Sequence, residues 1–257
     1  MLEERTGCVI VTGGARRMGA AIARRLIADG HRVIIHHRQS APEADAIVAE
    51  LGDRAVAIDQ DLSVDGAEIA LITAARAAFG VQVSGLVNNA SLFAFDRPPL
   101  PDGQSIEQHM RVNLTAPVLL ASAMAGQQDL RHGAIVNVLD QKLANLNPDF
   151  FSYSCSKMAL AGASIMLAQS LAPRITVNAV APGLTLPSMD QTEAEFDATC
   201  RLNLLHRPVG ADQVAGAVAF LLGAQGITGQ TIFVDAGQRF MPTARDVMFS
   251  TREAANG

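Results

Sequence analysis

The chain has 257 residues, of which 49% are hydrophobic and 18% are charged, and its formal net charge at pH 7 is −5. This composition predicts a well-buried core and argues against a disordered chain, while the negative charge argues against nucleic acid or an anionic membrane as the main partner. Three cysteines far apart in the sequence and six histidines without a metal-binding spacing predict free thiols in a reducing compartment and no metal site.

Short apolar runs alternate with longer amphipathic segments along the chain. The runs predict buried strands at residues 8–12, 32–36, 55–59, 85–90, 133–139, 175–180 and 230–237. The intervening segments predict helices at about residues 18–29, 42–51, 65–79, 106–126, 153–171 and 212–222. Strands that are apolar on both faces and alternate with helices form a parallel sheet covered on both sides. The pattern predicts the α/β class: one doubly wound Rossmann-type domain with a seven-stranded parallel sheet flanked by helices on both faces.

Two segments interrupt this pattern, at residues 91–104 and about 184–210. Both follow carboxyl ends of strands, where ligands bind in open α/β sheets, and we expect the second to carry short helices and act as a substrate lid. No linker divides the chain, so residues 1–257 are expected to form one domain, with a C-terminal tail at about 241–257. No apolar run reaches the ~18 residues of a membrane span and the charged start does not resemble a signal peptide, which predicts a soluble, cytoplasmic protein.

The segment TGGARRMG, residues 12–19, joins the first predicted strand to the first helix. Gly13 and Gly19 allow the backbone to turn and to approach a ligand closely, and the helix N-terminus presents N–H groups and a positive dipole to phosphates. Arg17 stands where the middle glycine of such a turn is expected. The turn predicts a dinucleotide site, and packing alone is the alternative explanation for its glycines.

The end of the second strand indicates which dinucleotide binds. NAD-preferring sites usually carry an acidic residue there, but this strand continues into HHRQS without a carboxylate. Arg38 and Ser40 could hold a 2′-phosphate, with Arg16 or Arg17 reaching it from the glycine turn. The pattern favours NADP(H), and a solvated surface charge is the alternative explanation for Arg38.

Tyr153 and Lys157 lie four residues apart at the start of a predicted helix, so they share one of its faces. Tyr153 is the only tyrosine in the chain. A nearby ammonium favours the phenolate and lowers the pKa of a phenol, so the pair is expected to act as a tuned proton donor.

These motifs occur in an order that resembles the short-chain dehydrogenase/reductase superfamily, over about residues 7–240. The matching elements are Thr12, Gly13 and Gly19 of the glycine turn, Asp61–Leu62, Asn88–Ala90, Asn113, Tyr153 and Lys157, Ala181–Gly183, and TGQTIFVDAG near the end. The resemblance implies a Rossmann-type domain, a nicotinamide cofactor and, usually, a homotetramer.

The resemblance also implies residue roles. Lys157 would hold the nicotinamide ribose and Asn113 a proton-relay water, while Asp61 would meet the adenine and Asn89 would line the cofactor channel. The expected catalytic residues are Tyr153, Lys157 and Asn113, together with Asp140, which stands at the position of the superfamily's serine. The implied cofactor-binding residues are Gly13, Arg16, Arg17, Met18, Gly19, His37, Arg38, Ser40, Asp61, Leu62, Asn89, Ala90, Ser91, Lys157, Pro182, Gly183 and Thr185.

Asp140 departs from the superfamily pattern, which usually places a serine at this position. An ionised carboxylate there would repel the alkoxide that forms when a ketone is reduced. It would favour a substrate with positive charge or N–H donors, such as a protonated C=N bond or an aminopyrimidine edge. A tolerated variant, or a protonated carboxyl that donates in place of the serine, is the alternative explanation.

Within the superfamily, the chain resembles the pteridine reductases and the related bacterial dihydromonapterin reductases. Those enzymes carry an arginine in the glycine turn, an aspartate in place of the serine and an aromatic residue after NNAS, which Arg17, Asp140 and Phe93 match. The resemblance implies NADPH-dependent hydride transfer to the ring of a dihydropterin, or of dihydrofolate, with proton delivery assisted by Tyr153 and Asp140.

The pterin would stack on Phe93, and the implied substrate residues are Arg17, Phe93, Asp140, Tyr153 and Leu184. Core closure is the alternative explanation for Phe93. Two other functions stay open at this point. One is a general NADPH-dependent carbonyl reductase acting on a ketone or a 3-oxoacyl substrate. The other is a dinucleotide-binding protein without catalytic activity.

Overall fold

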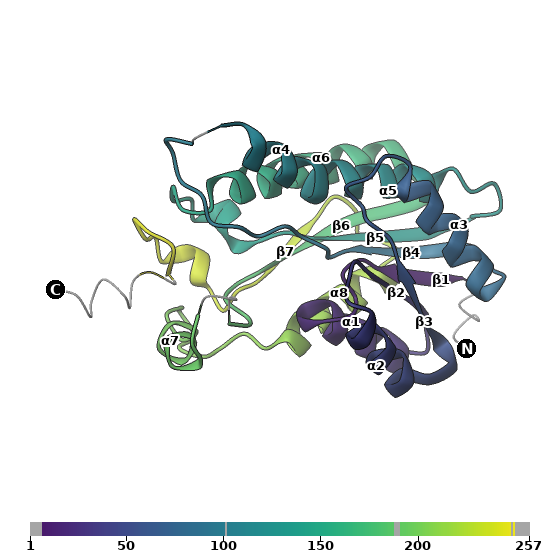
Figure 1. The fold of residues 1–257 in the computed structure, drawn as a ribbon, viewed down its shortest axis with the longest axis horizontal. Coiled ribbons are helices and arrows are strands. Elements are labelled where there is room, and N and C mark those ends of the chain that lie inside the picture. Colours follow the sequence, from purple (N-terminus) through teal and green to yellow (C-terminus); the bar gives the residue numbers. More distant parts are fainter. Residues whose placement is uncertain (1–6, 101, 188–190, 248, 250–257) are drawn as a thin grey trace.

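Seven parallel strands form one sheet in a computed structural model that describes residues 7–100, 102–187, 191–247 and 249 (Figure 1). The strand order is β3-β2-β1-β4-β5-β6-β7, and each neighbouring pair is parallel. The strands are β1 Cys8–Val11, β2 Arg32–His37, β3 Ala55–Asp59, β4 Val83–Asn88, β5 Gly133–Val138, β6 Ile175–Pro182 and β7 Thr231–Val234. The predicted doubly wound sheet is confirmed, and its order reverses between β1 and β4, which is where such folds bind ligands.

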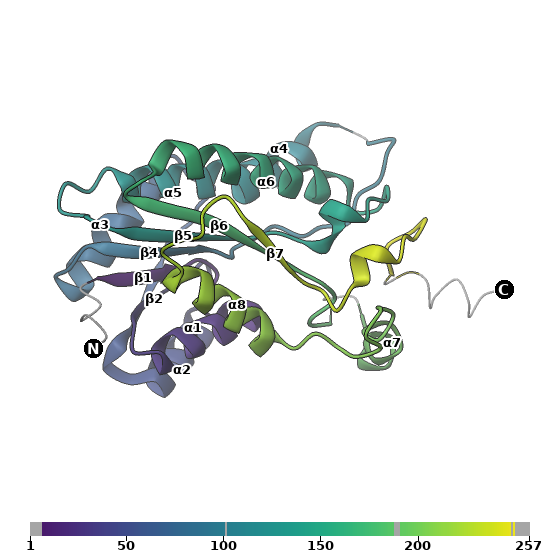
Figure 2. The ribbon, with the colours of Figure 1, turned by 180° about the vertical axis from the view of Figure 1, so that it is seen from behind.

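Helices cover both faces of the sheet, with α1, α2 and α8 on one face and α3, α4, α5 and α6 on the other (Figures 1 and 2). The α-helices are α1 Arg17–Ala28, α2 Ala41–Leu51, α3 Ala67–Phe79, α4 Gln104–Met110, α5 Ala116–Ala125, α6 Phe151–Leu171, α7 Glu193–Thr199 and α8 Ala211–Gly223. In the described ranges, none of them has the length and apolar character that a membrane crossing needs.

One predicted helix is wrong in detail, because residues 106–126 do not form a uniform α-helix. The π-helical turn η2, Arg111–Thr115, separates α4 from α5. Such turns occur often at functional sites, since they re-aim side chains without ending the helix. The expected lid contains one short helix, α7, which begins at a capping box between Thr192 and Glu195.

Side chains from successive residues of the central strands enter two separate cores. Val9 and Val11 pack on the face covered by α1 and α8, whereas Ile10 packs on the opposite face. Successive side chains of a strand point to opposite faces, so a strand covered on both sides must be apolar at every position. This explains why β1 appears in the sequence as an uninterrupted apolar run.

The glycine turn after β1 has a conformation that larger side chains resist. Gly13 has φ +62°, and a Cβ on Gly19 would lie 2.0 Å from the Gly13 carbonyl oxygen. Arg17 has φ +53°, in the left-handed region that favours glycine. The middle position of the turn therefore has a backbone suited to glycine, and the chain places an arginine there despite an energetic cost of about 1–2 kcal/mol.

We expect Gly19→Ala to lower the free energy of unfolding by about 1–3 kcal/mol, because the added methyl group must displace the Gly13 carbonyl. Gly162→Ala is a matched control within helix α6, where a Cβ meets no atom within 4 Å. It should raise the free energy of unfolding by about 0.5–1 kcal/mol. Chemical denaturation of both variants measures the two changes, and equal stability of Gly19→Ala and the parent would contradict the close contact.

Candidate active site

A cavity of about 870 Å³ lies at the carboxyl ends of β1, β2 and β4. Its walls come from the glycine turn, the end of β2, the segment after β3, the segment after β4, and the helical stretch at residues 107–112. The sequence-predicted residues that line it are Gly13, Arg16, Arg17, Met18, Gly19, His37, Arg38, Ser40, Asp61, Leu62, Asn89, Ala90 and Ser91. Segments far apart in the sequence therefore meet at the strand-order reversal.

The cavity also contains residues that the sequence analysis missed. They are Ala15, His36, Gln60, Ser63, Leu92, Glu107, Gln108, Arg111 and Val112. Of these, the residues of α4 and η2 are Glu107, Gln108, Arg111 and Val112, and only their position in the cavity wall identifies them. Lys157, Pro182, Gly183 and Thr185 are not among the lining residues, so their predicted contacts with a cofactor stay predictions.

Hydrogen bonds join the glycine turn to the neighbouring strand β4. The Thr12 hydroxyl oxygen accepts the backbone N–H groups of Asn89 and Ala90, each at 2.9 Å. The Asn89 amide donates to the carbonyl oxygens of Thr12 and Gly13, at 2.9 and 3.2 Å. The motif residues Thr12 and Asn89 thus hold the turn open toward the cavity.

His36 connects the same turn to β2 and was missed by sequence reasoning. Its Nδ1 lies 3.1 Å from the Gly13 backbone nitrogen and its Nε2 lies 2.8 Å from the Gln60 carbonyl oxygen. A carbonyl only accepts, so Nε2 carries the proton and Nδ1 accepts the Gly13 N–H. Burial lowers the pKa of His36 to about 4, with the Gln60 hydrogen bond opposing this shift, so the ring is neutral at physiological pH.

Two of the predicted phosphate-binding cations pair with carboxylates at the cavity rim. Arg38 lies 3.5 Å from Asp61, and Arg16 lies 3.3 Å from Glu43. The pKa of Asp61 is lowered, first by hydrogen bonds from the Ser63 hydroxyl and backbone N–H and then by Arg38. All four partners of these pairs are substantially exposed, so the ion pairs are weak and the arginines can exchange partners for a phosphate.

Arg17 joins the glycine turn to the lid segment at residues 184–210. Its guanidinium group donates a hydrogen bond to the Pro187 carbonyl oxygen and also lines the cavity. The left-handed backbone at Arg17 sends this side chain from the start of α1 across to the lid. The residue in place of glycine therefore adds a cation between the cavity and its cover.

Asn113 lies in the π-helical turn and is completely buried. Its Oδ1 accepts the Leu92 backbone N–H at 2.7 Å and the Ser91 hydroxyl at 3.2 Å. Its amide nitrogen donates to the Leu92 carbonyl at 2.9 Å and to the Ser156 hydroxyl at 3.0 Å. Both amide hydrogens are used within the protein, and the side chain anchors the loop that carries Phe93, while the expected relay-water role of Asn113 stays a prediction.

Asp140 and Tyr153 form a direct hydrogen bond, in which the Tyr153 hydroxyl donates to Asp140 Oδ2 at 2.8 Å. The Lys142 backbone N–H donates to the other carboxyl oxygen at 2.8 Å, at the start of the short 3-10 helix η3, Gln141–Ala144. Burial raises the pKa of Asp140, while the two hydrogen bonds oppose this shift. Both oxygens accept, which is the pattern of a carboxylate.

The expected lowering of the tyrosine pKa is wrong in this structure. Burial raises the pKa of Tyr153 well above its usual value, and the Asp140 carboxylate raises it further. Lys157 does not compensate, because its ammonium donates to the Val138 carbonyl at 2.7 Å and lies 5.7 Å from the centre of the Tyr153 ring. Burial lowers the pKa of Lys157 to about 8. Sequence spacing alone could not show that the nearest charge to the phenol is negative.

Phe93 lies directly beside the Asp140–Tyr153 pair. Its ring stacks on Phe150 at a centroid distance of 4.3 Å and meets the Tyr153 ring edge-on at 4.7 Å. It is nevertheless 43% exposed, so it does not simply close the core. Leu184, the other predicted substrate residue, has its backbone N–H bound to Gln238 Oε1 at 2.8 Å, where β6 enters the lid.

Comparison with known proteins identifies the family of the chain. The short chain dehydrogenase family matches residues 7–198. A solved structure of FolM alternative dihydrofolate reductase 1 from Brucella suis in complex with NADP is 39% identical, with a TM-score of 0.86, and the match covers 91% of this chain and 95% of that one. The chain therefore belongs to the short-chain dehydrogenase family.

Two further relatives have names that refer to different activities. The dihydromonapterin reductase of Klebsiella pneumoniae is 26% identical, over 93% of this chain and 99% of the relative. A 3-oxoacyl-[acyl-carrier-protein] reductase of Synechocystis is 32% identical, over 89% of this chain and 95% of the relative. Family membership thus establishes an oxidoreductase, and the choice of substrate depends on residues within the site.

The single tyrosine permits a direct test of the Asp140–Tyr153 contact, since the chain also lacks tryptophan. Near-ultraviolet absorbance of tyrosinate reports the ionisation of Tyr153 alone. We expect the midpoint to lie above the usual tyrosine pKa in the parent and to fall in Asp140→Asn, because the variant removes a negative charge beside the phenol. A midpoint that is unchanged in folded Asp140→Asn would contradict the assigned contact.

Proposed function

We propose that this protein is an NADPH-dependent pteridine reductase, which reduces a dihydropterin and also accepts dihydrofolate. The observation that carries the proposal is the half-buried Asp140 carboxylate, hydrogen-bonded to Tyr153 beside the partly exposed ring of Phe93. A carboxylate suits the N–H donors of an aminopyrimidine ring, and an aromatic face suits a flat heterocycle. Neither feature suits the alkoxide of a reduced ketone.

The cavity at the glycine turn fits a phosphorylated dinucleotide. A Cβ at Gly19 would fill the approach to the turn, and the N-terminus of α1 opens onto the cavity. Arg38, Ser40 and Arg16 would hold a 2′-phosphate, and Asp61 and Asn89 would line the adenine and ribose side. When bound, NADPH supplies a hydride equivalent. Solved relatives of similar fold are complexes with NADP or NADPH, which supports this assignment.

The proposed reaction adds two electrons and one proton to the C=N bond of a dihydropterin as a hydride equivalent, with a second proton delivered to nitrogen. Asp140 would bind the N–H groups of the pterin, and Tyr153 would deliver the proton from its hydroxyl. A phenol whose pKa is raised keeps its proton until the substrate nitrogen becomes basic. Lys157 would hold the nicotinamide ribose, and Arg17 would provide a cation at the meeting point of cofactor and substrate.

Relatives support the pterin substrate without deciding it. The names of the Klebsiella pneumoniae and Brucella suis proteins refer to a dihydropterin and to dihydrofolate. The Synechocystis relative supports the second candidate, a reductase of 3-oxoacyl or other carbonyl substrates. Asp140 separates the two candidates, because it favours a pterin and is unnecessary for a ketone. The homotetramer and the cytoplasmic location stay predictions.

Loss of NADPH absorbance in the presence of dihydropterins, dihydrofolate and simple ketones tests the proposal. We expect turnover with the pterins, and we expect Asp140→Ser to lower kcat/KM for them by about 10²-fold, the usual cost of removing a polar group that stabilises the reacting charge. The dissociation constant of NADPH should stay unchanged in the variant. Efficient ketone reduction without pterin turnover, or ketone activity that Asp140→Ser leaves unchanged or increases, would favour the carbonyl reductase.

Selection of the phosphorylated cofactor is tested with Arg38→Glu, which places a negative charge at the expected 2′-phosphate position. We expect KM for NADPH to rise about 10- to 100-fold, the value of a lost charge-assisted hydrogen bond, while KM for NADH stays constant or falls. Arg131→Glu, on an exposed residue before β5, makes the same change of charge away from the cavity. If both variants weaken NADPH binding equally, Arg38 has no specific role.

A further inference from the structure

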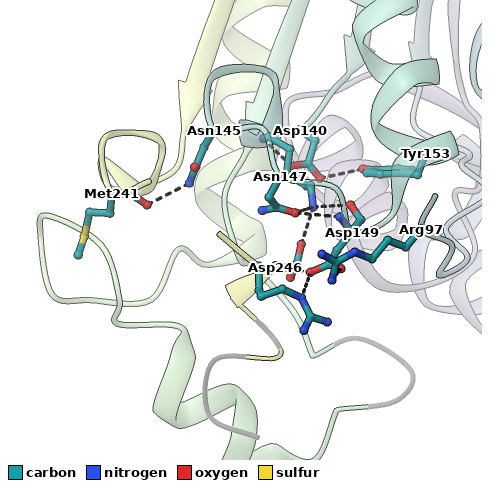
Figure 3. A network of polar contacts seen from close by, with 10 residues as sticks. Arg97, Asp140, Asn145, Asn147, Asp149, Tyr153, Met241 and Asp246 are labelled. Atoms are coloured by element: carbon teal, nitrogen blue, oxygen red, sulfur yellow. Dashed lines mark hydrogen bonds and ion pairs between the residues drawn. The ribbon is translucent and has the colours of Figure 1, made fainter. Parts of the chain in front are cut away.

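The described C-terminal segment, residues 241–247 and 249, lies against the part of the site that contains Asp140 and Tyr153 (Figure 3). The Met241 carbonyl accepts a hydrogen bond from the Asn145 amide at 3.1 Å. Further along, Asp246 Oδ2 accepts a hydrogen bond from the Lys142 ammonium at 2.8 Å. Lys142 is the residue whose backbone N–H binds Asp140, so the C-terminal segment is two contacts away from the proposed catalytic carboxylate.

Lys142 is a buried cation, with 4% of its surface exposed. Its ammonium donates to Asn147 Oδ1 at 3.0 Å, the Asp149 carbonyl at 3.0 Å and Asp246 Oδ2 at 2.8 Å. All three ammonium hydrogens are therefore used, and Asp246 supplies a countercharge in direct contact with this group. Removal of one partner of a buried ion pair leaves the other charge uncompensated.

A second ionic contact fixes the same segment. The Asp149 carboxylate is fully buried and accepts hydrogen bonds from Arg245 Nε and the Asp246 backbone N–H, both at 2.8 Å. Arg97, in the loop that also carries Phe93, lies 3.4 Å from the same carboxylate. Burial opposes the charge of Asp149, but Arg245 and the Asp246 N–H lower its pKa overall. Asp149 thus joins the C-terminal segment to the Phe93 loop.

Aromatic contacts also fix the C-terminal segment. Phe249 packs edge-on against Phe95 at 5.3 Å and lies nearly parallel to Phe150 at 6.2 Å. Phe150 in turn stacks on Phe93, whose ring adjoins Tyr153. The C-terminal segment therefore supports both halves of the substrate end, the charged half through Lys142 and the aromatic half through Phe150.

We propose that Asp246 and Phe249 are positioning residues of the active site, which hold Asp140 through Lys142 and the Phe93 ring through Phe150, and so confer selectivity for a flat, N–H-bearing substrate. The proposal rests on the proposed function for the identity of that substrate. If the segment only packs on the surface, substitutions in it leave the site unchanged. If Asp246 and Phe249 are positioning residues, their substitution alters the ionisation of Tyr153 and the binding of substrate.

The charges around Asp140 give the direction of these changes. Asp140 is faced by Tyr153 and Lys157 from α6, by Lys142 from η3 and by Asp246 from the C-terminal segment. The Asp246 carboxylate opposes the positive field of Lys142. Without it, Asp140 and Tyr153 experience a more positive surrounding, which favours the anionic form of both groups and lowers the pKa of each.

Asp246→Asn in the full-length protein tests the ionic half of the proposal by a titration that needs no substrate and by a pH–rate profile. We expect the near-ultraviolet tyrosinate titration of Tyr153 to shift to lower pH, and the acidic limb of the pH–rate profile to shift in the same direction. Asp246→Glu should restore both toward the parent, since it retains the charge. Asp53→Asn, on an exposed residue before β3, is the matched control and should shift neither. An unshifted titration in folded Asp246→Asn would overturn the proposal.

Phe249→Ala tests the aromatic half, with Phe240→Ala as control because Phe240 is 63% exposed and belongs to the same C-terminal region. With the substrate that the parent reduces, we expect Phe249→Ala to raise KM about tenfold by displacing the Phe93 support, at unchanged NADPH affinity. Phe240→Ala should leave KM unchanged. Equal effects of the two variants would overturn this half.

The Tyr153 titration and the turnover assay together distinguish failure of this proposal from failure of the proposed function. Absence of pterin turnover by the parent protein rejects the pteridine reductase assignment, but the Tyr153 titration still decides whether Asp246 acts on the site. Pterin turnover with an unshifted titration keeps the function and rejects the positioning role. Thermal unfolding of each variant shows that a folded protein has been compared.

Discussion

The hydrogen bond between Tyr153 and Asp140 is the interaction on which the rest of the site depends. A half-buried carboxylate loses part of its hydration, which is costly unless donors replace the water, and here the tyrosine hydroxyl and the Lys142 backbone N–H supply them. Lys142 is itself a buried cation that needs the Asp246 carboxylate. The charge of Asp140 is thus offset by Tyr153 and Lys142, and the charge of Lys142 is offset by Asp246. These contacts connect the site to the C-terminal segment.

The loop that carries Phe93 is held by an equally specific set of contacts. Asn113, placed by a π-helical turn, holds Ser91 and Leu92 through its side chain, while the Asp149 carboxylate holds Arg97. The loop is therefore anchored on both sides of its aromatic residues. A substrate that stacks on Phe93 would meet a surface arranged before binding, which lowers the entropic cost of forming the complex.

Much of the fold could be predicted because its signals are local. An uninterrupted apolar run such as Cys8–Val11 reflects burial on both faces of the sheet, and the glycine turn reflects a backbone that larger residues resist. The π-helical turn could not be predicted, since its residues are ordinary helix formers and their register is set by packing. His36 was missed for a similar reason: only the folded sheet brings its ring to the Gly13 N–H.

The sequence by itself determined the order of strands and helices, the glycine turn and the family, and it identified Arg17, Asp140 and Phe93 as departures from the general pattern. These depend on residue type and spacing along the chain. Tertiary structure alone decided the electrostatics of the site. Spacing predicted that Lys157 would lower the pKa of Tyr153, but the folded chain turns that ammonium to the Val138 carbonyl and places Asp140 on the phenol. A pKa depends on burial and on the nearest charge in space, and neither is a property of position in the sequence.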